Sequence, residues 1–128
     1  MYQVIIVDDE PRILEGIIHL FPWNNFGFEV VASFTNGKEA LEYINAHPQV
    51  DIVMTDIQMP VMNGLEATHR IRESARDDLR ALPIVVLSAN AFTEDVQESK
   101  RAGADDHLSK PISIKDLAAT LGGILGRA

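Results

Sequence analysis

The sequence predicts one doubly wound α/β domain, in which a parallel five-stranded sheet carries helices on both faces. Short apolar runs rich in β-branched residues alternate with amphipathic helical patterns along the whole chain. These runs lack the alternation of polar and apolar residues seen in half-exposed strands, which is typical of parallel strands buried on both faces. A length of 128 residues, 46% of them apolar, suits one domain with its own core.

Five segments are predicted to form the strands, four of them strongly apolar and the last one weaker. In chain order they are Val4–Val7, Val30–Ala32, Ile52–Thr55, Ile84–Leu87 and the weaker Asp106–Leu108. Strands that alternate with helices imply right-handed crossovers and a parallel sheet. We therefore expect the flavodoxin-like strand order 2-1-3-4-5.

The first two helices have clear start signals. Pro11 suits a first helical position, and one apolar face follows it, made of Ile13, Leu14, Ile17, Ile18 and Phe21. Asn36 with Glu39 resembles a capping box, and the helix that it opens is expected to stop at His47-Pro48. Its inward residues are predicted to be Ala40, Leu41 and Ile44.

Three further helices complete the predicted fold. They are expected to begin near Gly64, at a cap formed by Thr93, and at a cap formed by Ser113 with Asp116. The predicted inward residues are Leu65, Thr68 and Ile71 in the third helix, Val96 and Ala102 in the fourth, and Ile114, Leu117, Leu121 and Leu125 in the last.

Composition and charge exclude several classes of function. A net charge of −8 disfavours direct binding of nucleic acid, whose phosphates select clustered Lys and Arg. No apolar run reaches the roughly 18 residues of a membrane span, and the N-terminal run is too short for a signal peptide. The absence of cysteine excludes thiolate metal sites and favours a reducing compartment. We expect a cytoplasmic protein of one domain, residues 1–128, with no output domain attached.

Polar residues follow the predicted strands at the edge where open α/β sheets bind ligands. Strand one ends in Asp8-Asp9-Glu10, strand three in Thr55-Asp56 and strand four in Ser88-Ala89-Asn90, and Lys110-Pro111 follows strand five. Since the carboxyl ends of parallel strands meet at one edge, these side chains are predicted to converge.

Three carboxylates in a small volume repel one another unless a cation neutralises them. Asp8, Asp9 and Asp56 offer only oxygen ligands, which favour a hard cation, and Mg²⁺ fits best because it keeps water positions open for a phosphate. Lys110 adds an ammonium and Ser88 a hydroxyl that suit phosphoryl oxygens. The set predicts phosphoryl transfer by in-line attack of a carboxylate.

Each residue also has a simpler explanation when it is taken alone. Asp8 and Asp9 would serve as a solvated loop or a helix cap, and Asp56 as a turn residue. Ser88 would serve as a cap or a small core hydroxyl, and Lys110 as an ordinary solvated lysine. Their occurrence together at one predicted sheet edge favours the site.

These motifs resemble those of the response-regulator receiver domain in order and spacing over essentially the whole chain. The matching segments are Val7-Asp8-Asp9-Glu10, Asp56 with Met59-Pro60 and Gly64, Val86-Leu87-Ser88-Ala89, and Lys110-Pro111. Each motif alone is weakly specific, and the combination is strong.

The resemblance implies that Asp56 accepts a phosphoryl group from a histidine kinase or a phosphotransfer protein. It further implies that Mg²⁺ is bound by Asp9 and Asp56 directly, by Asp8 through water, and by the backbone carbonyl of Gln58. Lys110 would bind the phosphoryl group, and its peptide bond to Pro111 would be cis. A monomer or weak dimer is expected.

The resemblance also implies a switch. Ser88 would move toward the phosphoryl group, and the surface near the fourth helix and fifth strand would change. The family usually has Tyr or Phe three positions before the lysine, whereas this sequence has His107, so the usual aromatic readout is in question. Gln58 and Asn90 would face the attacking water.

The two halves of the chain resemble different receivers. Up to about Met59 the sequence is similar to receivers of AraC-type regulators, and from there onward to receivers of hybrid sensor kinases. Divergence within one family and a recombined or engineered chimera both explain this. Two other functions stay open: a flavodoxin-like cofactor binder, and a scaffold with an intact site but no physiological kinase.

Overall fold

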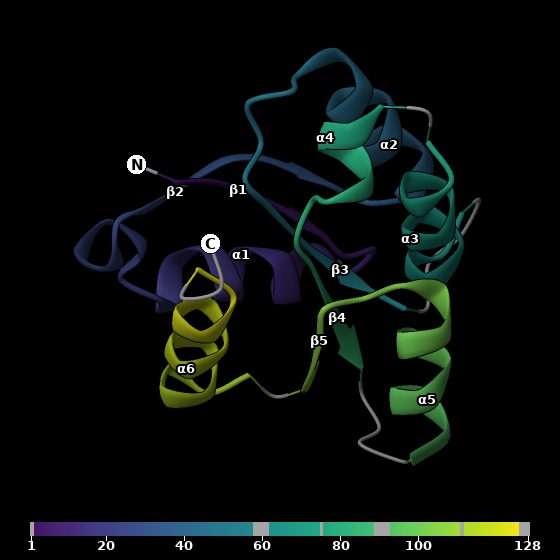
Figure 1. The fold of residues 1–128 in the computed structure, drawn as a ribbon. Coiled ribbons are helices and arrows are strands. Elements are labelled where there is room, and N and C mark those ends of the chain that lie inside the picture. Colours follow the sequence, from purple (N-terminus) through teal and green to yellow (C-terminus); the bar gives the residue numbers. More distant parts are fainter. Residues whose placement is uncertain (1, 58–61, 75, 89–92, 111, 126–128) are drawn as a thin grey trace.

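The structure, a computed structural model, describes residues 2–57, 62–74, 76–88, 93–110 and 112–125, with the backbone alone at 20, 93–95 and 125 (Figure 1). Its centre is a parallel sheet of the predicted strand order, β2-β1-β3-β4-β5. The strands are β1 (Tyr2–Val7), β2 (Phe28–Phe34), β3 (Ile52–Asp56), β4 (Ile84–Ser88) and β5 (Asp106–Ser109). The predicted fold class and strand order are confirmed.

Helices lie between successive strands along the chain, with two in succession after β1 and after β3. They are α1 (Pro11–Leu20), the 3-10 helix η1 (Trp23–Phe26), α2 (Gly37–Ala46), α3 (Gly64–Arg72), α4 (Asp77–Arg80), α5 (Thr93–Ala102) and α6 (Ile114–Leu125). None of the helices in the described part of the chain has the length and apolar character needed to cross a bilayer.

Side-chain caps start three of these helices. The Asn36 side chain accepts a hydrogen bond from the Glu39 amide at 2.9 Å, and the Ser113 hydroxyl accepts one from the Asp116 amide at 3.0 Å, both as predicted. Asn63 caps α3 in the same way. Each bond satisfies a helix-terminal N–H that has no partner within the helix.

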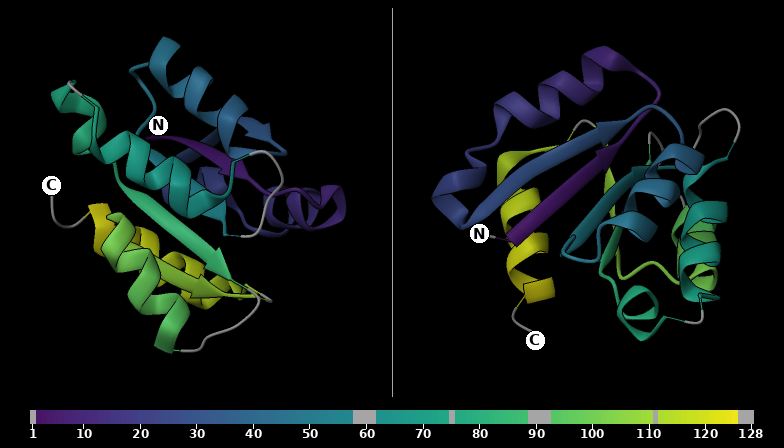
Figure 2. Two further views of the ribbon diagram at one scale, coloured as in Figure 1. Left: turned by 90° about the vertical axis from the view of Figure 1, so that its right-hand side faces the viewer. Right: turned by 90° about the horizontal axis from the view of Figure 1, so that it is seen from above.

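The sheet separates two apolar cores. The α1/α6 core joins α1 and α6 to one face, and the α2/α3 core joins α2, α3 and α4 to the other, where α5 also lies (Figure 2). The central strands are buried on both faces; for example, Ile6 faces the first core and Ile5 the second. This arrangement explains the continuous apolar runs in the sequence.

Some local predictions were wrong. Ile114, expected to be buried, is 43% exposed because it lies in the first turn of α6, and Ile112 packs against the α1/α6 core instead. Ile124, which had not been predicted, is buried beside Leu117 and Leu121. The Asp77-Asp78 pair begins the short helix α4, for which no helix was predicted. The predicted cap at Thr93 and burial of Leu125 concern side chains outside those described.

Candidate acidic site at the carboxyl edge of the sheet

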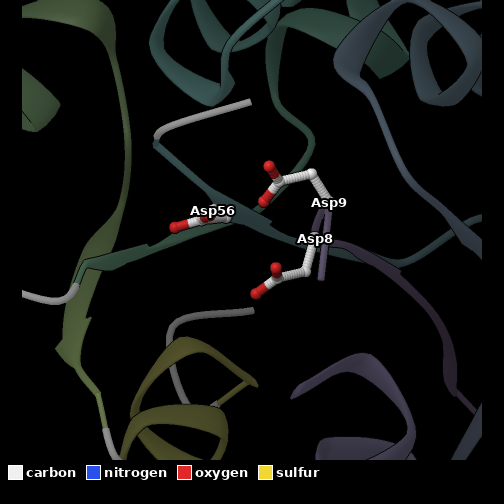
Figure 3. A group of neighbouring side chains, drawn as sticks. All are labelled: Asp8, Asp9 and Asp56. Atoms are coloured by element: carbon white, nitrogen blue, oxygen red, sulfur yellow. The ribbon is translucent and has the colours of Figure 1, made fainter. Parts of the chain in front are cut away.

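The carboxyl ends of neighbouring strands bring three acids together. Asp8 follows β1 directly, Asp9 comes next, and Asp56 is the last residue of β3, which pairs with β1. One carboxylate oxygen from each lies within 4.8 Å of the other two, and the three side chains reach into the same space (Figure 3). Asp8 is fully buried and Asp56 is 7% exposed, whereas Asp9 is open to solvent.

Lys110 lies between the two buried acids. Its Nζ donates to Asp8 Oδ2 at 2.7 Å and lies 3.3 Å from Asp56 Oδ1. The lysine is held in place by its own backbone, because its N–H donates to the carbonyl of Ser88 at 2.7 Å, just past the paired ends of β4 and β5. The ammonium therefore neutralises part of a cluster that would otherwise carry three negative charges.

Backbone amides orient the buried carboxylates. The Glu10 amide donates to Asp8 Oδ1 at 3.0 Å, and the Ile57 amide donates to Asp56 Oδ1 at 3.0 Å. These two donors were not predicted, since a backbone N–H is common to nearly all residues and leaves no signal in the sequence. Both amides leave part of each carboxylate available to other ligands.

Electrostatics in the cluster act in opposite directions. Burial raises the pKa of the Asp56 carboxyl, the Lys110 ammonium lowers it, Asp8 raises it again, and the net pKa is above the ordinary value. Burial lowers the pKa of Lys110, but the hydrogen bond to Asp8 and the attraction of Asp56 outweigh it, so the net pKa is raised. Lys110 is thus held charged beside a buried carboxyl whose charged form is disfavoured, and such perturbed pairs are frequent at functional sites.

The donor set fits a hard divalent cation. The described cluster offers carboxylate oxygens alone, two buried and one exposed, and Asp9 leaves a path from solvent. Magnesium is bound through one or two carboxylates with water completing the shell, which this arrangement permits.

The remaining predicted residues lie around this cluster or outside the described part. Ser88 is buried at the end of β4, and His107 pairs with Val86 in the adjoining strand. Ser88 and His107 share the face of the sheet opposite Leu87 and Leu108, because side chains alternate along a strand. Among the described residues, His107 Nε2 is a buried nitrogen without a hydrogen-bond partner. Gln58, Asn90 and the bond from Lys110 to residue 111 fall outside the described residues.

The other histidines and the tryptophan lie away from the site. His19 and His69 are exposed, and His47 stacks on Tyr43 at the end of α2. Trp23 is buried and its indole N–H donates to the Ile18 carbonyl at 3.1 Å, so it packs the connection between α1 and β2.

The sequence matches the family described as the response regulator receiver domain over residues 4–122. The sensor histidine kinase GacS of Pseudomonas protegens is 42% identical over 118 residues, which make up 91% of this chain and 12% of GacS. The uncharacterized transcriptional regulatory protein YesN of Bacillus subtilis is 31% identical over 121 residues, 94% of this chain and 32% of YesN. The chain thus spans a third or less of the length of these two relatives.

Solved structures show the same fold. The receiver domain of the sensor histidine kinase PA1611 of Pseudomonas aeruginosa matches with a TM-score of 0.81 at 27% identity, covering 98% of each chain, and it contains a magnesium ion in the active site cleft. The family match extends over most of the present chain, and the strand order and the acid cluster agree with it. This chain belongs to the response regulator receiver domain family.

Proposed function

We propose that Asp56 accepts a phosphoryl group from the phosphohistidine of a histidine kinase or a phosphotransfer protein, in a reaction that depends on Mg²⁺. The observation that carries the proposal is the cluster of Asp8, Asp9 and Asp56 at the ends of β1 and β3, with Lys110 bridging its two buried members. The kinship with GacS, a sensor histidine kinase, supports a partner of this class.

The chemistry follows from the positions of the charged groups. A carboxylate oxygen of Asp56 attacks phosphorus, the P–N bond of phosphohistidine breaks, and the imidazole nitrogen leaves with the electron pair and takes up a proton. Burial favours this role, because a carboxylate whose pKa is raised is a stronger nucleophile when ionised. The Lys110 ammonium, already within 3.3 Å of Asp56, is placed to contact a phosphoryl oxygen.

Asp9 and Asp56 would bind the ion through their side chains, Asp8 through water and Gln58 through its backbone carbonyl. Bound Mg²⁺ supplies positive charge that stabilises the transferring phosphoryl group. Because Asp9 is exposed, the ion and the phosphoryl donor could both reach the cluster from the same side of the sheet edge.

The response to phosphorylation is assigned to Ser88 and His107. Both belong to the face of the sheet on which α5 lies. A movement of the Ser88 hydroxyl toward a phosphoryl oxygen would change the packing around the neighbouring His107 side chain. The surface near α5 and β5 is therefore the proposed output surface. Gln58 and Asn90 would face the water that removes the phosphoryl group.

The proposal is tested by the intact mass of the protein after incubation with acetyl phosphate, with and without Mg²⁺. We expect a gain of one phosphoryl group in Mg²⁺, loss of that gain in EDTA, and no stable gain for Asp56→Asn. A stable phosphoryl adduct on Asp56→Asn at the wild-type level would contradict the acceptor assignment.

A panel of histidine kinases then distinguishes a signalling module from a scaffold with an intact site. Transfer from at least one kinase to the wild type, and from none to Asp56→Asn, is expected. Acceptance from acetyl phosphate without acceptance from any kinase would favour the scaffold. A cytoplasmic location and a monomeric or weakly dimeric state stay predictions.

A further inference from the structure

Gly37, the first residue of α2, lies against the segment that leads into α3. Its N–H donates to the Met62 carbonyl at 2.9 Å. A Cβ at position 37 would come within 2.6 Å of that same carbonyl oxygen, within 3.2 Å of the Ala67 Cβ and within 3.3 Å of the Asn63 carbonyl. Two of these three atoms are backbone, so relief requires the segment itself to move.

The segment held by Gly37 is in turn bonded to the residues at the end of β3. The Gly64 amide donates to the Ile57 carbonyl at 3.1 Å. A Cβ on Gly64 would lie 2.1 Å from the Asp56 carbonyl oxygen and 3.0 Å from Thr55 Oγ1, so the start of α3 is in direct contact with the backbone of Asp56. Asn63 caps this same turn.

The last contact reaches the acidic site itself. The Ile57 amide, whose carbonyl is held by Gly64, donates to Asp56 Oδ1 at 3.0 Å and also to the Leu87 carbonyl at 3.1 Å. Because this amide is shared between two acceptors, any shift of Ile57 weakens its hydrogen bond to at least one of them. The orientation of the Asp56 carboxylate is therefore linked to the close approach at Gly37 by a short series of backbone contacts.

From these contacts we infer that Gly37 is a positioning residue of the acidic site, which sets the orientation of the Asp56 carboxylate toward a divalent ion by allowing α2 to approach Met62. The inference rests on the proposed Mg²⁺ site. It adds Gly37 to that site, although the helix α2 supplies no ligand. Loss of a hydrogen-bond partner of a metal ligand, which here is the Ile57 amide on Asp56, typically changes metal affinity by roughly 10–100-fold.

The test compares Gly37→Ala with Gly16→Ala. Position 16 is exposed in α1 and a Cβ there meets nothing within 4 Å, so this variant adds the same methyl group without a clash. Alanine favours helix over glycine, so neither substitution is expected to melt its helix. Calorimetric titration with Mg²⁺ should show affinity weakened by roughly tenfold in Gly37→Ala and unchanged in Gly16→Ala.

A second pair keeps the test decisive if Gly37→Ala does not fold. Asn63→Ala removes the cap of α3 beside Gly64, and Ser113→Ala removes a cap of the same kind from α6. Both should lose similar stability in urea, but only Asn63→Ala should bind Mg²⁺ more weakly and shift the Ile57 amide resonance.

Equal Mg²⁺ affinity in the wild type, Gly37→Ala and Asn63→Ala would overturn the positioning role and leave the proposed function intact. Failure of the wild type to bind Mg²⁺ would overturn both.

Discussion

Lys110 and Asp8, 102 positions apart in the chain, form an ion pair of 2.7 Å at the carboxyl edge of the sheet. Asp8 is fully buried and the Lys110 side chain is 15% exposed, so the two charges neutralise each other in a region that water reaches poorly. The pair joins β1 to the end of β5, two strands that are not adjacent in the sheet. It therefore links the ends of β1 and β5 and holds the ammonium 3.3 Å from Asp56 Oδ1 at the same time.

Lys110→Met should destabilise the protein in EDTA by an amount on the order of 3 kcal/mol, because it leaves the buried Asp8 carboxylate without its cation. Mg²⁺ should then restore more stability to Lys110→Met than to the wild type, since the ion replaces the missing charge. Thermal unfolding with and without Mg²⁺ measures both effects. Lys115→Met, at an exposed position on α6, is the control, and an equal Mg²⁺ response in all three proteins would contradict the prediction.

Asp56→Asn should raise the thermal stability at neutral pH in the absence of metal. Burial is the main cause that raises the pKa of Asp56, so the folded state favours the protonated carboxyl. The stabilisation that protonation provides is complete below the unfolded pKa and is lost as pH rises through the folded pKa, which leaves a net cost at neutral pH.

The neutral side-chain amide of Asp56→Asn removes the loss of stability that the ionised carboxylate causes. Each kcal/mol of stability gained corresponds to roughly 3–6 °C in Tm for a chain of this size. A pH series of melting curves should show a smaller difference between Asp56→Asn and the wild type as the pH falls toward 4. Asp9→Asn, at the exposed member of the cluster, should change Tm less. A lower Tm for Asp56→Asn at pH 7 would show that burial is not the dominant influence.

Ser88→Ala should leave phosphorylation of Asp56 largely intact while weakening the conformational response, because the hydroxyl contributes to one of two states rather than to the acceptor. Beryllofluoride with Mg²⁺ mimics the phosphoryl group, and amide chemical shifts in α5 report the response. The matched control is Ser109→Ala, at the exposed residue that pairs with Ser88 across β4 and β5. A full α5 response in Ser88→Ala would contradict the switch role.

Arg72→Lys should cost roughly 1–3 kcal/mol of stability. The guanidinium donates to the carbonyls of Gly103, Arg80 and Leu82 and to the Asp105 carboxylate, a set that a single ammonium cannot reproduce. Urea unfolding measures the loss. Arg70→Lys is the control, because its pair with Glu66 is solvent-exposed and such pairs contribute little; equal effects at the two positions would refute the prediction.

Unfolding should be a single cooperative transition even though the two halves of the sequence resemble different receivers. Both cores draw residues from each side of Met59; the α1/α6 core, for example, joins Leu14 and Ile17 to Leu117 and Leu121. Far-ultraviolet circular dichroism and the fluorescence of Trp23, which lies in that core, should give one midpoint. Separate midpoints would indicate poor packing between the halves.

The fold was predictable because its signals are local and repeated. The apolar runs later seen as β1, β3 and β4, and the caps at Asn36 and Ser113, each follow from a few neighbouring residues. Where a prediction failed, the deciding contact was remote: the exposure of Ile114 depends on how the first turn of α6 lies over the sheet, which the period of the helix does not specify.

The grouping of Asp8, Asp9 and Asp56 was also within reach of the sequence, because polar residues after buried parallel strands gather at one edge. Their individual environments were not. Asp8 and Asp9 are neighbours of the same type, yet one is fully buried against Lys110 and the other is exposed. That difference arises from the direction in which each side chain leaves the end of β1.

The sequence by itself determined the strand order, most of the inward helical residues and which carboxylates meet, because these depend on periodicity and on the constraints of a parallel sheet. The tertiary structure alone decided that the ammonium of Lys110 contacts both Asp8 and Asp56, and that Gly37 lies too close to the Met62 carbonyl for a Cβ to fit without a shift. Both outcomes depend on distances of a few ångströms between segments far apart in the chain, and such distances are set by packing.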